Sequence, residues 1–494
     1  MAEKHVVARS GRPGGARIEN STKSGFAGFS AAIISLGCAK NLVNSEQMAS
    51  ALVSAGFALT PDAYGADAAV VNTCAFIGPA KQEAVETLLQ LSELKKAGFL
   101  GKIIVAGCLA ERYKDEIAAE LFEADGFLGV GAFGDVAEVV TAALSGARPQ
   151  SFPPPENCDD NLPRVVSTPK AWTYLKIADG CDNHCAFCAV PSIRGRYRSR
   201  REEDILREAR RLAESGAREL IIIAQDTTRY GLDLYGERRL APLLRKLSEL
   251  PGVKWLRVHY LYPDGVTDEL LREFAENPKL LKYFDIPIQH ISDGVLKKMR
   301  RRGTAAEIRV LFAKIRRELP GAVLRTSIIT GLPGEGDAEF DELCDFLRGA
   351  KLERVGVFPF SPEEGTAAFD MPRPDEDTAR ARAQIIEELQ SRVLDEFNLS
   401  RIGAETDVLV EGFDDARSGR SSPDSICESG EAGFNGDVLY GRSFAESPDI
   451  DGVVVIEGGA QPGEFTRVRV TGADGADIIG EVLPPPPPRR GTNG

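Results

Sequence analysis

Six of the nine cysteines in this chain stand where thiolate ligands of a metal centre are expected. Three of them lie within the segment Cys181-Asp-Asn-His-Cys185-Ala-Phe-Cys188, directly after the apolar run YLKIADG. Three thiolates at this spacing can hold three irons of a [4Fe–4S] cube, and the fourth iron then stays open to a substrate. Such an iron can chelate the amino and carboxylate groups of S-adenosylmethionine (SAM) and reduce its sulfonium, which releases a carbon radical.

The alternative for this motif is a structural zinc site in which His184 completes a Cys3His set. Adjacent His184 and Cys185 would strain one tetrahedral centre, and the sequence has no second C-x2-C knuckle. The C-x3-C-x2-C spacing after an apolar strand therefore favours the radical chemistry.

Cys38, Cys74 and Cys108 form a second, dispersed set, with intervals of 36 and 34 residues. Each is the last residue of an apolar run: AAIISLGC, AAVVNTC and GKIIVAGC. These intervals are close to one βαβ unit, and the carboxyl ends of parallel strands meet at one crevice of a sheet. Three unrelated buried thiols are the alternative. The shared position favours a second three-thiolate cluster with an open iron, which leaves Cys158, Cys344 and Cys427 as incidental cysteines.

The elements that must position these cysteines fall into three blocks. A length of 494 residues predicts about three domains, and 43% hydrophobic with 27% charged residues is typical of globular proteins. We expect a flexible leader at residues 1–30, an N-terminal cluster domain at 31–147 and a linker at 148–170. A radical barrel follows at 171–400, then a small β-barrel at 401–484 and a disordered tail at 485–494.

The fold class predicted for these blocks is α/β with a C-terminal all-β module. Apolar runs that alternate with helical sequence indicate a parallel sheet in the first block. Five short strands separated by Gly and Asp turns after Gly403 indicate a small antiparallel β-barrel. In the central block, six strand candidates alternate with amphipathic helices, which favours a partial or complete (β/α) barrel; the candidates are 172–178, 219–225, 255–262, 283–289, 322–330 and 354–361.

The motifs SLGCAKNLVNSE, NTCAFI, AGCLAERY, ADGCDNHCAFCAVPSIRGRYRSR and YFDIPIQHISDGVLKKMRR resemble those of the radical SAM methylthiotransferases. The resemblance covers about residues 31–484 and implies that the last module is a TRAM domain. NTCAFI, GCLAERY, VHYLYP and RGRYRSR are similar to the branch that modifies an aspartate of small-subunit ribosomal protein twelve. The tRNA-adenosine branch usually has CQMN-like sequence after the first cysteine. Asn44, Gly336 and Phe360 depart from the usual pattern, and none is an expected ligand.

The resemblance implies two [4Fe–4S] clusters and two roles for SAM. One SAM would methylate a sulfur at the Cys38/Cys74/Cys108 cluster, and another would be cleaved to a radical at the Cys181/Cys185/Cys188 cluster. The radical would take hydrogen from the aspartate β-carbon, which would then capture the methylthio group. Because acid–base side chains cannot cleave an unactivated C–H bond, we expect no catalytic side chain. The cycle also needs an electron donor, of flavodoxin or ferredoxin type.

Two residues near the compact motif are candidate cofactor contacts. Phe187 could pack against the adenosine or could simply be a core aromatic. Asp226 follows a predicted strand and is a candidate contact for the cofactor ribose. A basic run follows the motif and consists of Arg194, Arg196, Arg198, Arg200 and Arg201. In an extended segment the first four would lie on one face. That face would either bind a carboxylate or be a solvated charged surface.

The charge distribution bears on the substrate. The net charge is −14, and residues 401–484 hold six arginines, no lysine and 17 carboxylates, a net charge of −11. Such a module repels phosphates and attracts a basic ribosomal protein. A protein substrate is therefore expected and RNA contact is disfavoured, with an RNA substrate as the alternative and a non-catalytic assembly scaffold as a third hypothesis. No apolar run reaches membrane-spanning length and no secretory signal is evident, so we expect a cytoplasmic protein.

Overall fold

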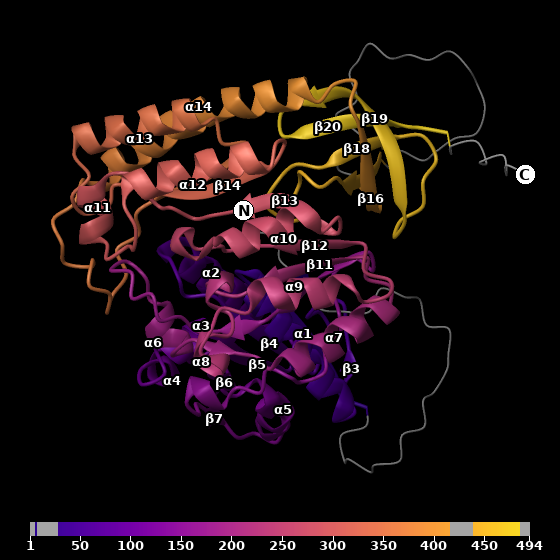
Figure 1. The fold of residues 1–494 in the computed structure, drawn as a ribbon. Helices are drawn as coiled ribbons and strands as arrows, with labels where there is room; N and C mark the ends of the chain where they lie inside the picture. Colours follow the sequence, from indigo (N-terminus) through magenta and orange to yellow (C-terminus); the bar gives the residue numbers. More distant parts are fainter. Residues whose placement is uncertain (1–4, 7–27, 415–437, 485–494) are drawn as a thin grey trace, which may run out of the picture.

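The computed structural model describes residues 5–6, 28–414 and 438–484. Most of the expected leader, most of the polar insertion at 413–432 that includes Cys427, and the expected tail lie outside these described residues. Within them the chain forms an N-terminal α/β domain, a central barrel-like α/β domain and a C-terminal β-barrel (Figure 1).

The N-terminal domain is built on a seven-stranded sheet with the order β1-β2-β4-β5-β6-β7, in which β3 also pairs with β2. All pairings are parallel except β1 with β2. The strands are β1 (His5–Val6), β2 (Ser30–Ser35), β3 (Ala58–Leu59), β4 (Ala68–Thr73), β5 (Lys102–Gly107), β6 (Gly126–Leu128) and β7 (Gln150–Ser151). The helices are α1 (Ala39–Ser54), α2 (Gly78–Lys96), α3 (Cys108–Arg112), α4 (Ile117–Glu120) and α5 (Val136–Leu144). The predicted parallel sheet is confirmed.

The central domain is a six-stranded parallel sheet with the order β15-β14-β13-β12-β11-β8, so the barrel is partial rather than closed. Its strands, β8 (Trp172–Lys176), β11 (Glu219–Ile223), β12 (Trp255–Val258), β13 (Leu280–Asp285), β14 (Val323–Thr330) and β15 (Arg354–Pro359), match the six predicted runs. The inner strands are almost wholly buried, polar side chains such as Lys176, Glu219 and Arg257 included, whereas the edge strand β15 is partly exposed.

Amphipathic helices cover the outside of this sheet (Figure 1). They are α7 (Glu202–Glu214), α9 (Leu240–Ser248), α10 (Asp268–Glu276), α12 (Ala305–Glu318), α13 (Asp337–Ala350) and α14 (Glu376–Ser400). Shorter elements sit at the open end: β9 (Ala178–Asp179), β10 (Arg198–Ser199), α6 (Val190–Arg194), α8 (Leu232–Tyr235) and α11 (Asp293–Lys298).

The C-terminal module is a closed five-stranded barrel of β16 (Glu405–Asp414), β17 (Val438–Arg442), β18 (Val454–Glu457), β19 (Phe465–Asp474) and β20 (Asp477–Val482). The predicted small β-barrel is confirmed with one correction, because β18 and β20 pair in parallel. Its interior is a small apolar cluster that includes Val408, Val454 and Val468.

The three domains share buried interfaces. The N-terminal core continues into the barrel through Trp172, Ile221 and Ile223. The proline-rich segment at 148–170 contacts both domains, since Asp160 pairs with buried Lys176 of the barrel at 2.6 Å and its carbonyl accepts from Gln47 on α1 at 3.2 Å. These contacts hold the carboxyl edge of the first sheet against the open end of the barrel.

Candidate active site

The dispersed cysteines converge because β2, β4 and β5 are adjacent parallel strands in register. Cys38 is the N-cap of α1, Cys74 follows β4 directly, and Cys108 is the first residue of α3 after β5. Cys38 acts on the pKa of both Cys74 and Cys108, and Cys108 acts on that of Cys74. The three cysteines therefore lie at one edge of the sheet, and their binding of a metal cluster stays a prediction.

Two glycines make this convergence possible. Gly37 and Gly107 each precede a cysteine of the set and have φ of +88°. A Cβ at Gly37 would lie 2.5 Å from the Cβ of Cys74, and one at Gly107 would lie 2.2 Å from Oδ1 of Asn72. Only glycine combines this backbone conformation with such close approach.

The three thiols have unequal electrostatic surroundings. Burial would raise the pKa of Cys38, but the charges of Lys40 and Arg194 outweigh it and hold that pKa below the ordinary value. Burial, together with the charges of Cys108 and Cys38, raises the pKa of Cys74 to about 12. Burial likewise raises the pKa of Cys108. A metal centre that binds all three as thiolates must therefore displace protons from the site.

The compact set lies in a loop between β9 and α6. Backbone N–H groups approach two of its sulfurs, Asn183 N to Cys181 Sγ at 3.5 Å and Val190 N to Cys188 Sγ at 3.4 Å. The side chain of Arg301 donates to Cys185 Sγ at 3.5 Å. Burial raises the pKa of Cys181 to about 11 and that of Cys188 to about 12.

The chemistry of these two donor sets fits iron–sulfur cubes better than zinc. His184, the extra ligand of the zinc hypothesis, is exposed. In the described part of the chain, no group of three or more His, Cys, Asp or Glu side chains could hold a single metal ion. In a cube each thiolate binds a different iron, so the sulfurs do not converge on one point. All cysteines of both sets are free of disulfides.

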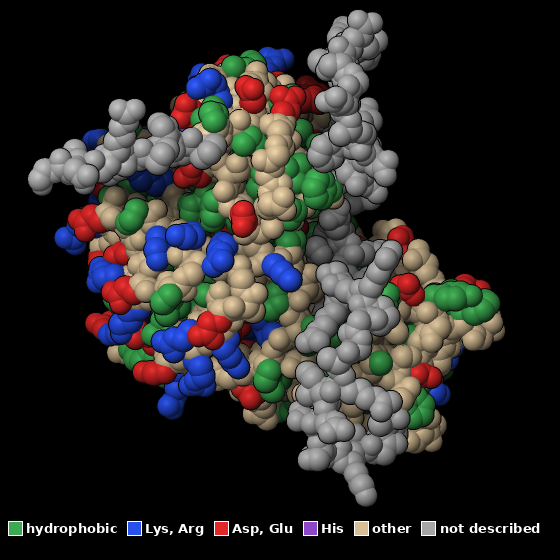
Figure 2. All heavy atoms as spheres, turned by 90° about the vertical axis from the view of Figure 1, so that its right-hand side faces the viewer, with side chains coloured by type: hydrophobic (Ala, Val, Ile, Leu, Met, Phe, Trp, Pro, Cys, Tyr) green, Lys and Arg blue, Asp and Glu red, His purple; other side chains and the backbone are tan. Residues whose placement is uncertain are grey.

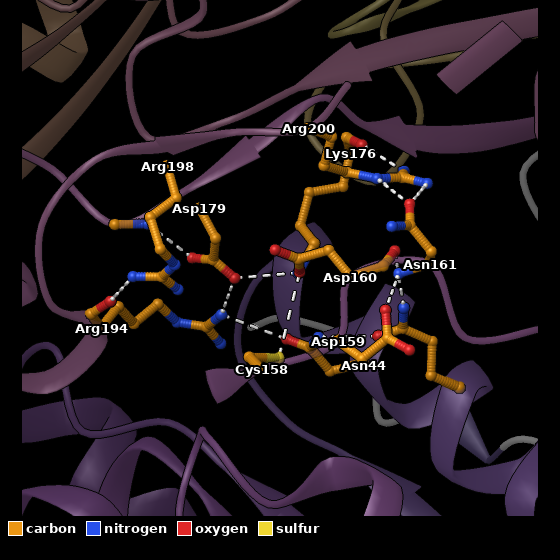
Figure 3. Close-up of polar contacts among 12 residues, drawn as sticks. Asn44, Cys158, Asp159, Asp160, Asn161, Lys176, Asp179, Arg194, Arg198 and Arg200 are labelled. Carbon is orange, nitrogen blue, oxygen red and sulfur yellow. Dashed lines mark hydrogen bonds and ion pairs between the residues drawn. The ribbon is translucent and has the colours of Figure 1, made fainter. Parts of the chain in front are cut away.

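Arg194 connects the two sets. It ends α6, six residues after Cys188, and is buried between the domains. Its guanidinium donates to Asp179 on the barrel side at 2.8 Å and to Asn44 on α1 at 3.1 Å. Figure 3 shows Asp179 between Arg194 and Lys176, and Lys176 donates to the same carboxylate at 2.9 Å. The guanidinium also acts on the pKa of Cys38 and Cys108.

The predicted arrangement of the other arginines is wrong. The segment is not extended, because α6 ends at Arg194 and Gly195 follows with φ of +73°. Arg196 is exposed, whereas Arg200 is buried and pairs with Glu208 at 2.6 Å. Arg198 is half-buried and donates to main-chain carbonyls, and Arg201 is exposed. The first four therefore do not share one face.

The two cofactor candidates lie beside the compact loop. Asp226 is buried, caps the short helix that begins at Thr227, and accepts a hydrogen bond from Asn183 at 2.9 Å. It therefore fastens the loop that carries the cysteines. Phe187 is half-buried and packs on the apolar cluster that contains Phe360. A ribose contact for Asp226 and an adenosine contact for Phe187 stay predictions.

Buried polar atoms without a partner in the described residues mark a place for a polar ligand. Asn183 Oδ1 and Gln225 Oε1 are two of them, and both side chains border the compact loop. Amide oxygens of this kind suit the ammonium and hydroxyl groups of SAM.

The two barrel histidines are structural: His259 contacts Ser447 at 2.9 Å, and His290 accepts from Ser292 N at 3.0 Å.

Sequence reasoning missed several residues that shape the site. Lys40 and Asn41 were contained in the SLGCAKN motif, and Arg301 in KKMRR, but nothing in their spacing indicated which sulfur they would approach. Asp179 was also missed, although its place two residues before Cys181 could have suggested a role.

Family models match all three domains. The radical SAM superfamily matches residues 175–347, the model described as uncharacterized protein family UPF0004 matches 30–129, and the TRAM domain matches 426–483. Among solved structures, the radical SAM methyltransferase TsrM from Kitasatospora setae superposes with a TM-score of 0.50 and 14% identity, covering 67% of this chain and 71% of that one. At this identity the likeness concerns the fold alone.

Sequence relatives cover nearly the whole chain. The ribosomal protein uS12 methylthiotransferase RimO of Caldanaerobacter subterraneus subsp. tengcongensis is 42% identical over 91% of this chain and 99% of its own length. The protein of the same name from Pelotomaculum thermopropionicum is 43% identical over 92% of this chain and 100% of its own. In the described residues no helix is long and apolar enough to cross a membrane. The chain belongs to the ribosomal protein uS12 methylthiotransferase family of radical SAM enzymes, which use a [4Fe–4S] cluster and SAM.

Proposed function

We propose that this enzyme inserts a methylthio group at the β-carbon of an aspartate in ribosomal protein uS12, with one [4Fe–4S] cluster on each set of cysteines. The observation that carries the proposal is the placement of two three-cysteine sets at the carboxyl edges of two parallel sheets, connected by the buried side chain of Arg194. Each set leaves one corner of a cube without a protein ligand.

Each set of cysteines would hold a cluster with a different role. Cys181, Cys185 and Cys188 would hold the cluster that binds SAM, and Asn183 would contribute a polar contact from the same loop. When bound, this pair supplies the one-electron chemistry that an unactivated C–H bond requires. The dispersed set would hold the second cluster beside Lys40 and Arg194, whose positive charges suit an added sulfur anion.

Polar contacts also join the N-terminal domain to the barrel. Ion pairs join the domains at the β15 side of the barrel opening, where Glu363 pairs with Arg112 at 2.6 Å and with Lys81 at 2.8 Å. Gly78 N donates to Ser361 Oγ at 3.0 Å in the same region. These contacts fix the two domains relative to each other, and a fixed arrangement of the reacting groups is a large part of what an enzyme can add to such a reaction.

The charge of the C-terminal module supports a basic protein as substrate. Several of its carboxylates are neutralised within the fold, as where Glu446 pairs with Arg354 and Arg401 and Glu411 pairs with Arg442. Exposed carboxylates remain at Asp407, Glu457, Glu464, Asp474 and Glu481. On the face shown in Figure 2, basic and acidic side chains are interspersed over the described surface. The exposed carboxylates of the C-terminal module would repel the phosphates of an RNA backbone.

The remaining partners follow from the chemistry. An electron donor of flavodoxin or ferredoxin type would reduce the cluster on the compact set, and the reaction would take place in the cytoplasm, where uS12 is available. RNA contact is not required by this scheme.

The test is a paired incubation. Anaerobically reconstituted enzyme, SAM and a reductant are mixed with either purified uS12 or unmodified tRNA, and both substrates are analysed by mass spectrometry. We expect a methylthio addition on one aspartate of uS12 and no change in the tRNA. A methylthio-adenosine with unmodified uS12 would replace the proposal by the RNA alternative, and absence of SAM cleavage would favour a non-catalytic scaffold.

A further inference from the structure

Lys40 is a buried lysine whose charge acts on Cys38 and which also faces the barrel. It lies on α1, two residues after Cys38, and only 8% of it is exposed. Its Nζ lies 3.5 Å from the ring centroid of Tyr260, which comes from the barrel. Among the described residues no carboxylate forms an ion pair with Lys40, and the groups that favour its ammonium are the side chains of Tyr260 and Cys38.

A second buried lysine shows how unusual this is. Lys176 is also buried, but Asp160 at 2.6 Å and Asp179 at 2.9 Å neutralise it. A buried ammonium without a carboxylate is unfavourable, and one aromatic face compensates for only part of the lost hydration. Lys40 therefore has capacity for an anion that arrives from outside the chain.

The position of Tyr260 places this capacity between the two sets of cysteines. Tyr260 follows β12 and has φ of +59°, a conformation that costs energy for an aromatic residue and is concentrated at functional sites. Its carbonyl accepts from Thr227 N at 3.1 Å, and its N–H donates to Asp285 at 3.0 Å. Asp226, next to Thr227, holds Asn183 of the compact loop.

Lys40 is not the only cation near the thiols of the dispersed set, because Arg194 also faces them. Arg194 acts on the pKa of both Cys38 and Cys108 and is itself held by Asp179. Lys40 also acts on Cys38, but its Nζ lies over the ring of Tyr260, which belongs to the barrel. A carboxylate brought to this point of the domain boundary would meet the ammonium and the tyrosine together.

We propose that Lys40 and Tyr260 form the receptor for the side-chain carboxylate of the acceptor aspartate. This inference rests on the proposed function and names the group by which the site would select its substrate. The β-carbon of aspartate is bonded directly to the carboxylate carbon, so an ammonium that fixes the carboxylate also fixes the carbon to be modified. A charge-assisted hydrogen bond from Lys40, with the tyrosine hydroxyl beside it, supplies both direction and selectivity.

The experiment is a cycle of two enzymes and two substrates. Wild-type enzyme and Lys40→Met are each reconstituted and assayed with uS12 and with uS12 whose acceptor aspartate is replaced by asparagine. Equilibrium binding of both proteins to the reconstituted enzymes, without reductant, is measured by fluorescence anisotropy. We expect Lys40→Met to lower kcat/KM for normal uS12 by about 100-fold and to remove the preference for aspartate over asparagine in both measurements.

Two further variants keep the test decisive. Lys81→Met removes a lysine at the same domain boundary that already has a carboxylate partner, and it should leave the preference for aspartate unchanged. Tyr260→Leu should weaken the preference as Lys40→Met does, which provides a second route if Lys40→Met folds poorly. Iron content and the electron paramagnetic resonance of the reduced clusters should match the wild type in Lys40→Met.

Three outcomes would overturn the inference. Equal losses with both substrates, or a changed iron content or spectrum, would show that Lys40 serves the cluster at Cys38. Weaker SAM cleavage without uS12 would show that it serves the cofactor carboxylate. If the wild-type enzyme modifies tRNA and leaves uS12 unmodified, the proposed function itself is refuted. If the wild-type enzyme modifies uS12 and Lys40→Met does so equally well, only the inference about Lys40 is refuted.

Discussion

The two sets of cysteines reach the same kind of site by opposite routes. The compact set comes from one loop, in which Cys181, Cys185 and Cys188 are brought together by local turns. The dispersed set depends on a whole sheet, since strands β2, β4 and β5 must be parallel, adjacent and in register before its thiols can meet. The first site should therefore tolerate changes in the N-terminal domain, whereas the second requires that domain to be folded.

Their electrostatic surroundings differ as well. Lys40 and Arg194 lower the pKa of Cys38, while the pKa of Cys181 and that of Cys188 are raised by burial. Two buried cations favour additional negative charge at the dispersed set. The compact set has one close arginine, Arg301, and polar atoms without partners, which suits a neutral or zwitterionic ligand.

The largest expected effect separates the two sets by their chemistry. Cys185→Ala should abolish both SAM cleavage and methylthio transfer, whereas Cys74→Ala should abolish transfer but retain SAM cleavage. Each variant should lower the iron content from about eight to about four per chain. Iron analysis, 5′-deoxyadenosine formation and mass analysis of uS12 measure these three quantities.

The control is Cys344→Ala, because Cys344 is buried on α13 away from both sets. It should keep full iron content and activity. If Cys74→Ala keeps full iron content and transfer, the dispersed set does not hold a cluster and the comparison fails.

The next effect concerns the connection between the sets. Arg194→Met removes a buried charge that donates to Asp179 and Asn44, and it leaves Asp179 with Lys176 as its remaining cation. Breaking a buried pair of this kind should lower the free energy of unfolding by about 3 kcal/mol. Chemical denaturation measures the loss, and Arg196→Met, at a side chain that is 87% exposed, should change stability by less than about 0.5 kcal/mol. Equal effects of the two variants would mean that Arg194 does not hold the domains together.

How far the sequence could predict this architecture depends on how local each feature is. The compact motif was evident from spacing alone. The dispersed set was evident from the equivalent places of Cys38, Cys74 and Cys108 after apolar runs, because strand ends are predictable even when strand order is not. The course of the chain after Cys188 was not predictable, since Gly195 allows α6 to end abruptly and turns the arginines in different directions.

Contacts between domains were beyond sequence reasoning for a physical reason. Glu219 on β11 pairs with Arg257 at 2.7 Å and with Arg442 of the C-terminal module at 2.7 Å, although the last of these is more than 200 residues away. No hydrophobic periodicity in the sequence indicates such a pairing.

A smaller effect should appear in thiol reactivity. In metal-free enzyme at pH 7.5, Cys38 should be alkylated by iodoacetamide about 10-fold faster than Cys188, because a lowered pKa leaves more thiolate at that pH. The difference should narrow as the pH rises above the ordinary thiol pKa, where Cys38 is already fully ionised and the thiolate fraction of Cys188 still increases. Peptide mass mapping over time gives both rates. A faster reaction at Cys188 would reverse the electrostatic contrast between the two sets.

The smallest expected effect involves Asn44, which lies on α1 and contacts Arg194. Its Oδ1 accepts from Arg194 at 3.1 Å and its Nδ2 donates to Gln47 at 3.0 Å. Asn44→Asp would give Arg194 a second carboxylate but would bury another charge and lose the donor to Gln47, so the gain and the cost nearly cancel. We expect the free energy of unfolding to change by less than about 1 kcal/mol, with unchanged iron content. A loss of several kcal/mol would mean that Asp179 alone already satisfies Arg194, and that this part of the connection between the two sets is closed to further negative charge.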